Sequence, residues 1–146
     1  MKSLKSKIHL QLRSILEKSL EEARREYLLA KESRDSDTKS SAGDKFETGR
    51  EMMQREMDKW SALVDNTVNS LVKLDKLANS QASTIISEGS LVETDQATYY
   101  LSIGYGKLDS VYAISIESPM GLALKGKQVG ESIEMRGLNI MIKHIS

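Results

Sequence analysis

Apolar residues in the first half of the chain recur at the spacing of a helix. Between Ile8 and Ala30 they follow one another at steps of three or four residues, which places them on one helix face. A second series runs from Met53 to Ala78 with alternating steps of four and three residues, interrupted by the polar Thr67. This alternation is typical of the narrow seam of a coiled coil and predicts two packed helices.

The segment between the two series, residues 33–43, contains several serines and a glycine and is too short to link two domains. Its length suits a turn between antiparallel helices. We therefore expect residues 1–79 to form an antiparallel two-helix coiled-coil hairpin, with an acidic tip at residues 33–48.

The pattern changes after Asn79, where a serine-containing connection precedes short segments rich in β-branched and aromatic residues. A short helix is expected from Pro119, because Ser118 suits the N-cap, proline the first helical position and Gly126 the left-handed position after the helix. The expected strands are 91–93, 98–103, 111–116, 132–135 and 138–145. The predicted fold class is therefore α+β, in which an antiparallel β-sheet domain of residues 80–146 with one short helix follows the hairpin.

Composition narrows the chemistry. Hydrophobic residues make up 39% of the chain, which suits a two-helix seam and a small sheet better than one large core. The 21 basic residues balance the 21 acidic ones, so no global charge attracts nucleic acid or an anionic membrane. The absence of cysteine excludes thiolate sites, and two histidines at opposite ends of the sequence exclude a zinc finger. Without a signal-like or membrane-spanning apolar run, a soluble cytoplasmic protein is expected.

Residues 118–131 carry the most specific motif of the chain, S-P-M-G-L-A-L-K-G-K-Q-V-G-E. This segment resembles the signature S-P-x-G-R-A-L-x-G-K-x-V-G-[DE] of the C-terminal domain of the bacterial Gre transcript-cleavage factors, with Leu122 in place of the arginine. The hairpin, its tip, the connection and the C-terminal domain also follow the order of that family. The resemblance therefore covers nearly the whole chain.

The resemblance implies a fold, a partner and a docking surface. It implies that the C-terminal domain is FKBP-like and docks on the largest-subunit rim of the secondary channel of RNA polymerase. The hairpin of a monomeric factor would enter the channel, and contact with the RNA 3′ end would occur only within the complex. Such a factor is not itself an enzyme, because it stimulates Mg-dependent cleavage of backtracked RNA by the polymerase during transcription elongation. The docking residues implied within the signature are Ser118, Pro119, Met120, Gly121, Lys125 and Lys127.

The tip of the hairpin carries the residues that would act in cleavage. The segment Gly43-Asp44-Lys45-Phe46-Glu47-Thr48 resembles the family's tip pattern G-D-x-x-E-N, which gives Asp44 and Glu47 the roles of the catalytic acids in the polymerase active site. Mg²⁺ prefers oxygen ligands and is often shared with phosphates, so Asp44 is the candidate ligand of a Mg²⁺ shared with the polymerase. No cofactor is expected for the isolated chain. Asp35 and Asp37 are supplementary acids of the tip or, alternatively, a solvated pair.

Other interpretations fit the same residues. Asp44-x-x-Glu47 at a helix start is also a capping box, and the helix dipole favours acids in the first turn. Lys45, Phe46 and Thr48 depart from the family's tip, which makes this tip less acidic. An alternative function is therefore a Gre-like secondary-channel regulator of transcription without cleavage activity. A third is a coiled-coil interaction module or a peptidyl-prolyl isomerase, because a fold alone does not determine function.

Overall fold

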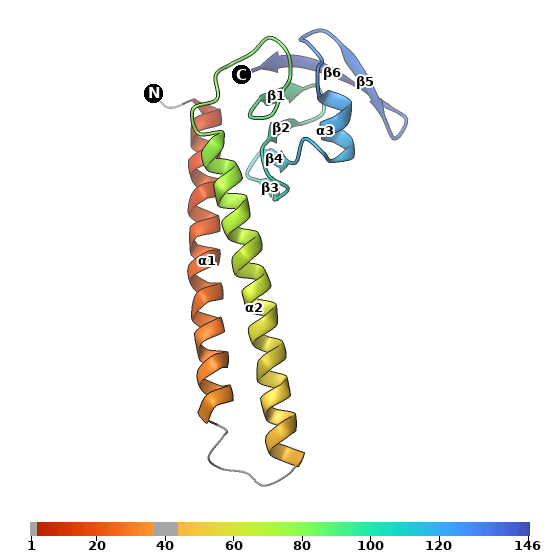
Figure 1. Cartoon of the computed structure of the whole chain (residues 1–146). Coiled ribbons are helices and arrows are strands. Elements are labelled where there is room, and N and C mark those ends of the chain that lie inside the picture. Colours follow the sequence, from red (N-terminus) through yellow and green to blue (C-terminus); the bar gives the residue numbers. More distant parts are fainter. Residues whose placement is uncertain (1–2, 37–43) are drawn as a thin grey trace. The chain divides into compact units, whose positions relative to one another are not determined.

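The computed structural model describes the backbone of residues 3–36 and 44–146, and the side chains of these residues except 44–47 (Figure 1). Two long helices come first, α1 (Leu4–Ser36) and α2 (Asp44–Lys76), and they pack together as the sequence predicts. Each has 33 residues, which at 1.5 Å per residue is a length of about 50 Å. A sheet and one short helix follow, so the fold class is α+β. None of the helices within the described residues is both long and apolar enough to cross a bilayer.

The chain divides into two compact units. The sheet unit contains residues 1–13 and 72–146, and the hairpin unit contains residues 14–71. The start of α1 and the end of α2 therefore belong with the sheet, whereas the sequence pattern placed the boundary at residue 79. Each helix contributes to both units.

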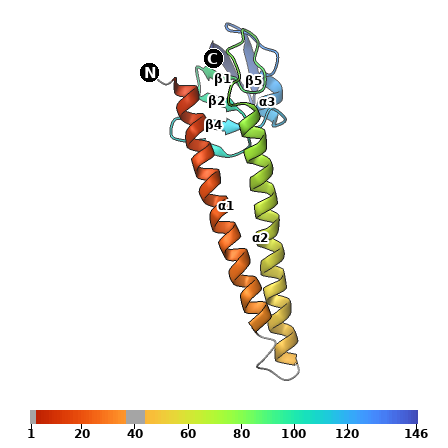
Figure 2. The same cartoon turned by 60° about the vertical axis from the view of Figure 1, so that its left-hand side comes forward.

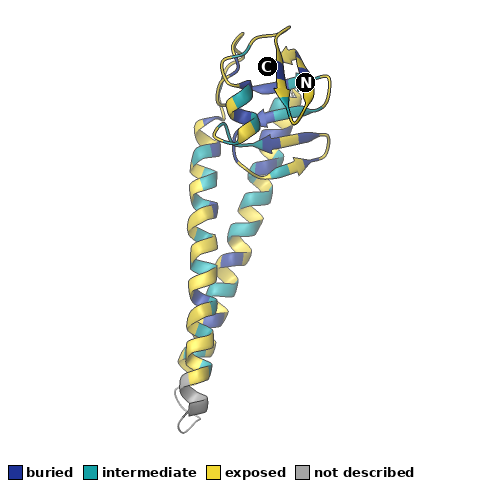
Figure 3. Ribbon diagram, turned by 90° about the vertical axis from the view of Figure 1, so that its right-hand side faces the viewer, coloured by how far each residue is buried: buried dark blue, intermediate teal, exposed yellow. Residues whose placement is uncertain are grey.

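Burial in the hairpin unit follows the predicted seam (Figure 3). Ala23 and Ala30 of α1 are buried, as are Met57 and Thr67 of α2. The hydroxyl of Thr67 donates to the carbonyl of Leu63 at 2.7 Å, which explains how a polar residue occupies the seam at little cost. The alternating steps of four and three residues thus identified the packed face correctly.

Trp60 lies on this seam but is only partly buried. Its indole N–H donates to the carboxylate of Glu56 at 3.1 Å, and the ammonium of Lys59 lies 4.8 Å from the ring centroid. Met52, next to the seam, is 55% exposed, as its position predicts. Trp60 therefore packs with one part of its ring and interacts with polar groups through the rest.

The described part of the sheet unit contains a six-stranded sheet with the order β3-β4-β2-β1-β6-β5 (Figures 1 and 2). Its strands are β1 (Leu91–Thr94), β2 (Thr98–Leu101), β3 (Gly106–Leu108), β4 (Val111–Ile114), β5 (Ser132–Met135) and β6 (Leu138–Ile145). The last two strands have the predicted bounds, while β2 and β4 each end two residues earlier than predicted.

The prediction of an antiparallel sheet was wrong at one pair of strands. β2 and β4 are parallel, with Thr98 opposite Val111 and Leu101 opposite Ile114, whereas the other neighbouring strands of the described sheet are antiparallel. The cause is β3, which the sequence pattern treated as part of a turn beginning at Gly104. Because β3 forms a hairpin with β4, the chain reverses twice after β2, and β4 runs in the same direction as β2.

The short helix α3 (Pro119–Leu124) packs closely against the backbone that precedes it. Gly121 is buried, and a Cβ built on it would lie 2.7 Å from the Cα of Ile116 and closer still to the carbonyl oxygen of Ser115. Leu124 on the same helix is fully buried in an aliphatic core. The other buried members of that core are Ile86, Val92, Leu101, Ile133, Ile140, Ile142 and Ile145. Glycine at position 121 is what allows α3 to reach this core.

We expect Gly121→Ala to lower the free energy of unfolding of the full chain by about 2 kcal/mol or more, because backbone atoms must shift to admit the methyl group. Urea unfolding followed by circular dichroism measures the change. Gly104→Ala is the matched control, since a Cβ there meets nothing within 4 Å and the residue lacks a positive φ. An equal loss in the two variants would contradict the close approach at Gly121.

Candidate functional site

Of the predicted tip acids, Asp35 lies near the end of α1, and Asp44 and Glu47 lie at the start of α2. α2 begins at Asp44, so Asp44 and Glu47 both belong to its first turn, which is where the tip pattern placed them. Their side chains fall outside the described residues, and Asp37 lies outside them entirely. Their roles in catalysis and in metal binding therefore remain predictions.

Asp35 is the one predicted tip acid whose side chain the structure describes. It lies in the last turn of α1, is exposed, and forms an ion pair with the guanidinium of Arg34 at 3.1 Å. Arg34 also donates to the amide oxygen of Gln54 on α2 at 2.8 Å. Asp35 is thus paired with Arg34, whose guanidinium also links α1 to α2. Among the described residues, no group of three or more acidic, histidine or cysteine side chains is arranged to hold a metal ion.

The first half of the signature segment forms the capped start of α3. The Ser118 hydroxyl accepts a hydrogen bond from the Gly121 N–H at 3.1 Å and donates to the Ser115 carbonyl at 2.6 Å. Pro119 follows in the first turn, where a missing N–H costs nothing. The predicted cap is therefore confirmed, and Ser118, Pro119 and Gly121 each have a structural reason to be present.

The second half of the segment is a turn that joins α3 to β5. Gly126 has a φ of +79°, and its N–H donates to the carbonyl of Ile86, while the N–H of Ile86 donates to the carbonyl of Lys127. Gly130 also has a positive φ, of +92°, and donates to Ile142. A carboxylate oxygen of Glu131 accepts from the backbone N–H of Gln128 at 2.6 Å, closing the turn. Gly126, Gly130 and Glu131 of the signature thus stabilise the turn.

Exposed side chains of the same segment are available for a partner. Leu122 is 62% exposed and Val129 is 55% exposed, so both present aliphatic surface to solvent. Lys125 is also exposed, Met120 and Lys127 are partly so, and Gly121 is buried. Among the predicted docking residues, Gly121 is therefore needed for the packing of α3 and has little exposed surface for a partner. Lys125 and Pro119 are the two that are exposed.

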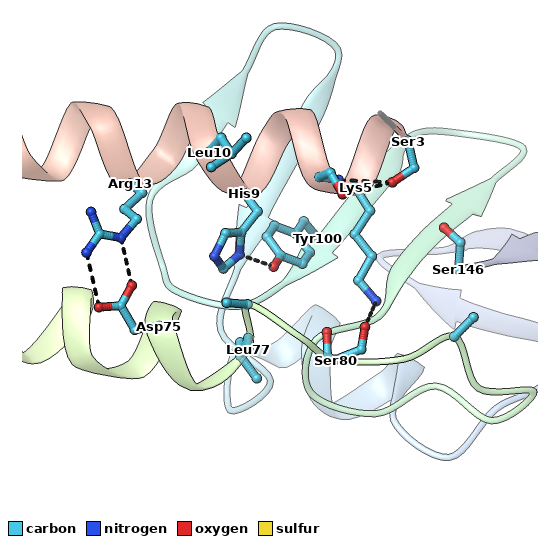
Figure 4. Close-up of a pocket in the computed structure, with 13 residues that line it drawn as sticks. Ser3, Lys5, His9, Leu10, Arg13, Asp75, Leu77, Ser80, Tyr100 and Ser146 are labelled. Carbon is cyan, nitrogen blue, oxygen red and sulfur yellow. Dashed lines mark hydrogen bonds and ion pairs between the residues drawn. The ribbon is translucent and has the colours of Figure 1, made fainter. Parts of the chain in front are cut away.

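The sequence interpretation missed a second site, a cavity of about 660 Å³ within the sheet unit (Figure 4). It lies beside the first turns of α1 and the end of α2. His9 is 8% exposed, and its Nδ1 lies 2.8 Å from the hydroxyl of the fully buried Tyr100 on β2. Arg13 and Asp75 form an ion pair at its edge, with N–O distances of 2.8 and 3.3 Å. His9 directly follows a seam residue, but nothing in the sequence pairs it with a tyrosine 91 positions away.

Burial is the main cause of the pKa shifts of Lys5, His9 and Tyr100, which line this cavity. The pKa of Tyr100 is raised to about 12, because burial disfavours the phenolate. The pKa of His9 is lowered chiefly by burial; the charge of Asp75 opposes this effect, and those of Arg13 and Lys5 add to it. Burial also lowers the pKa of Lys5, whose ammonium donates to the carbonyl of Ser80 at 3.3 Å. His9 and Tyr100 are therefore both neutral near pH 7.

Comparison of the chain with models of known protein families, and with curated proteins, finds no match.

The buried His9 should make the stability of the sheet unit depend on pH. Because its pKa is below the ordinary 6.5 in the folded protein, its contribution to stability is complete above that pH. The contribution is lost as the pH falls from 6.5 toward the folded value, since the unfolded chain then binds the proton more readily. We expect His9→Gln to flatten the dependence of the unfolding free energy on pH between about pH 7 and 5, as measured by urea unfolding.

The control for this prediction is His144→Gln. It removes the other histidine of the chain, which is exposed and lies 3.3 Å from Glu93. We expect its pH profile to follow that of the wild type. Parallel profiles for wild type and His9→Gln would contradict the assigned role of His9.

Proposed function

We propose that this chain is a Gre-like transcription factor that binds RNA polymerase at its secondary channel and stimulates Mg-dependent cleavage of backtracked RNA. The proposal rests on one observation, which is that the hairpin with its acidic start of α2 and the sheet unit with the signature segment occur in the same chain. A helical hairpin whose second helix starts with Asp44-x-x-Glu47 is followed by a sheet unit in which the signature segment 118–131 forms a capped helix and a closed turn. This combination follows the order of parts in the Gre signature and tip pattern, and that order supports the proposal.

The hairpin unit supplies the reach. From Ser14 to Ser36, α1 has 23 residues within this unit, which correspond to about 35 Å of helix. A buried seam holds the two helices together, and the pairing of Arg34 with Gln54 joins them near the turn. Such an arm can present its turn at a distance from its base without unfolding. That is the property a factor needs to deliver a side chain into another protein's active site.

The acids at the start of α2 supply the chemistry. Asp44 and Glu47 are separated by about one helical turn and carry oxygen donors of the type that Mg²⁺ prefers. Asp44 would hold the ion together with groups of the polymerase, and a bound Mg²⁺ would lower the pKa of the attacking water. Glu47 adds a second negative charge to the same turn. The described residues offer no competing cluster for a metal ion.

The exposed residues of the signature segment supply the docking surface. Lys125 and the partly exposed Lys127 flank the glycine turn, and Leu122 and Val129 expose aliphatic surface on the same segment. Exposed aliphatic and charged side chains both contribute to protein interfaces. The structural roles of Ser118 and Gly121 fix the backbone on which these side chains stand.

Asp44→Asn separates metal binding from a structural role at the start of α2, because asparagine has the size of aspartate and keeps an oxygen acceptor but has no charge. We expect this variant to bind polymerase and to melt as the wild type does. It should stimulate cleavage of RNA in a stalled, backtracked complex on the order of a hundredfold less, since a catalytic carboxylate is lost. Gel analysis of the shortened RNA measures the rate.

Asp65→Asn is the control for that experiment, because Asp65 is an exposed acid in the middle of α2. This variant should stimulate RNA cleavage by the polymerase at the wild-type rate. Equal cleavage by Asp44→Asn and wild type would leave Asp44 with a structural role only. If the wild type itself binds polymerase but shortens no RNA at any Mg²⁺ concentration, the cleavage function is wrong and the non-cleaving channel regulator replaces it.

Reversing the charges of the signature segment should weaken docking. We expect the double variant Lys125→Glu, Lys127→Glu to raise the Kd for RNA polymerase about tenfold or more, while folding normally. The matched control is Lys107→Glu, Lys143→Glu, which makes the same change in net charge on exposed positions of β3 and β6. Equal weakening by both double variants would assign the effect to overall charge and contradict docking through this segment.

A further inference from the structure

The cavity beside His9 is the second feature of this chain that fits a ligand, and it is independent of the proposed function. Its walls within the sheet unit include the aliphatic side chains of Leu77 and Ala82, together with Lys5, His9 and the fully buried Tyr100 (Figure 4). A volume of about 660 Å³ is in the range of small-molecule sites. The question is which chemistry its polar groups select.

The tautomer of His9 follows from Tyr100. The Tyr100 hydroxyl is buried and keeps its proton at neutral pH, so it needs an acceptor. His9 Nδ1, at 2.8 Å, is the partner of that hydroxyl among the described residues. We therefore assign Nδ1 as the acceptor, which places the ring proton of the neutral imidazole on Nε2.

The Nε2–H of His9 is consequently a donor without an acceptor in the described part of the chain. Among the described residues, the His9 side chain makes one hydrogen bond, from Tyr100 to Nδ1. Only 8% of the residue is exposed. Nε2 lies on the side of the ring turned away from Tyr100 (Figure 4). The oxygens of the neighbouring Asp75 already accept from Arg13 at 2.8 and 3.3 Å. The Nε2–H is therefore accessible from the cavity, where it can donate to a ligand oxygen.

Lys5 adds a positive charge to the same wall. Its ammonium makes one hydrogen bond among the described residues, to the carbonyl of Ser80 at 3.3 Å, which leaves donor capacity toward the cavity. Arg13 of the wall is paired with Asp75, which leaves Lys5 as the charged donor that a ligand can reach. The wall thus offers one ammonium group and one neutral N–H donor. A group with a single negative charge and two acceptor oxygens matches it.

We propose that this cavity binds a small organic monocarboxylate, whose oxygens accept from Lys5 Nζ and His9 Nε2. Its aliphatic part contacts Leu77 and Ala82. A phosphate dianion fits less well, because Arg13 is paired with Asp75 and the Lys5 ammonium alone is left to balance its two charges.

The two histidines of the chain allow a test with an internal control, because His144 is exposed on β6 and lies outside the cavity. Full-length protein labelled with ¹⁵N is titrated with sodium butyrate up to about 50 mM at constant ionic strength, and the imidazole resonances are followed by NMR. We expect a saturable shift of the His9 signals with an unchanged His144. The spectrum of the free protein should show the Nε2–H tautomer of His9.

Lys5→Met should weaken butyrate binding about tenfold or more, because it keeps the aliphatic stem and removes the charge. Lys7→Met is the matched control, since Lys7 is an exposed residue of α1 that does not line the cavity, and it should bind as the wild type does. Equal shifts of both histidines, no shift of His9, an Nδ1–H tautomer, or a response to phosphate but not to butyrate would each overturn the proposal. The wild-type titration decides even if a variant fails to fold.

Discussion

The contact between His9 and Tyr100 determines how the sheet unit is built. A buried tyrosine hydroxyl requires a partner, and Tyr100 of β2 finds it in His9 Nδ1, 2.8 Å away in the first turns of α1. Ile8, Leu12 and Leu74 are buried in the same unit, so apolar packing accompanies this polar contact. The ends of the hairpin are therefore part of the sheet unit. A chain cut at residue 79 would lose the partner of His9.

The sequence predicted the helices well because their information is local. A repeat of three and four residues identifies the buried stripe, as the burial of Ala23 and Met57 confirms. The parallel pairing of β2 with β4 was missed, because it depends on β3, a three-residue strand that begins at a glycine. Such a strand has too few side chains to show a period. The same limit applies to the His9 cavity, whose walls come together only in the folded chain.

The signature segment illustrates how resemblance and activity differ. Ser118 and Gly121 are needed for the start of α3, and Gly126 adopts a φ of +79°. These residues would be present in any protein that uses this helix and turn, so they report on the fold. Exposed side chains of the same segment, Leu122 and Lys125, have no such role in the described fold, so they are the positions at which a contact with a partner can be tested.

The balance of charges also constrains how the chain can meet a partner. With 21 basic and 21 acidic residues, the protein has no net charge to steer it over long distances. Recognition by the signature segment would therefore depend on short-range contacts, in which the exposed Leu122 and Val129 bury apolar surface and Lys125 selects a negatively charged neighbour. Leu122 stands where the Gre signature has an arginine, so an apolar contact would replace a polar one at that point. A partner that binds this chain through this segment is consequently expected to present an apolar patch beside an acidic group.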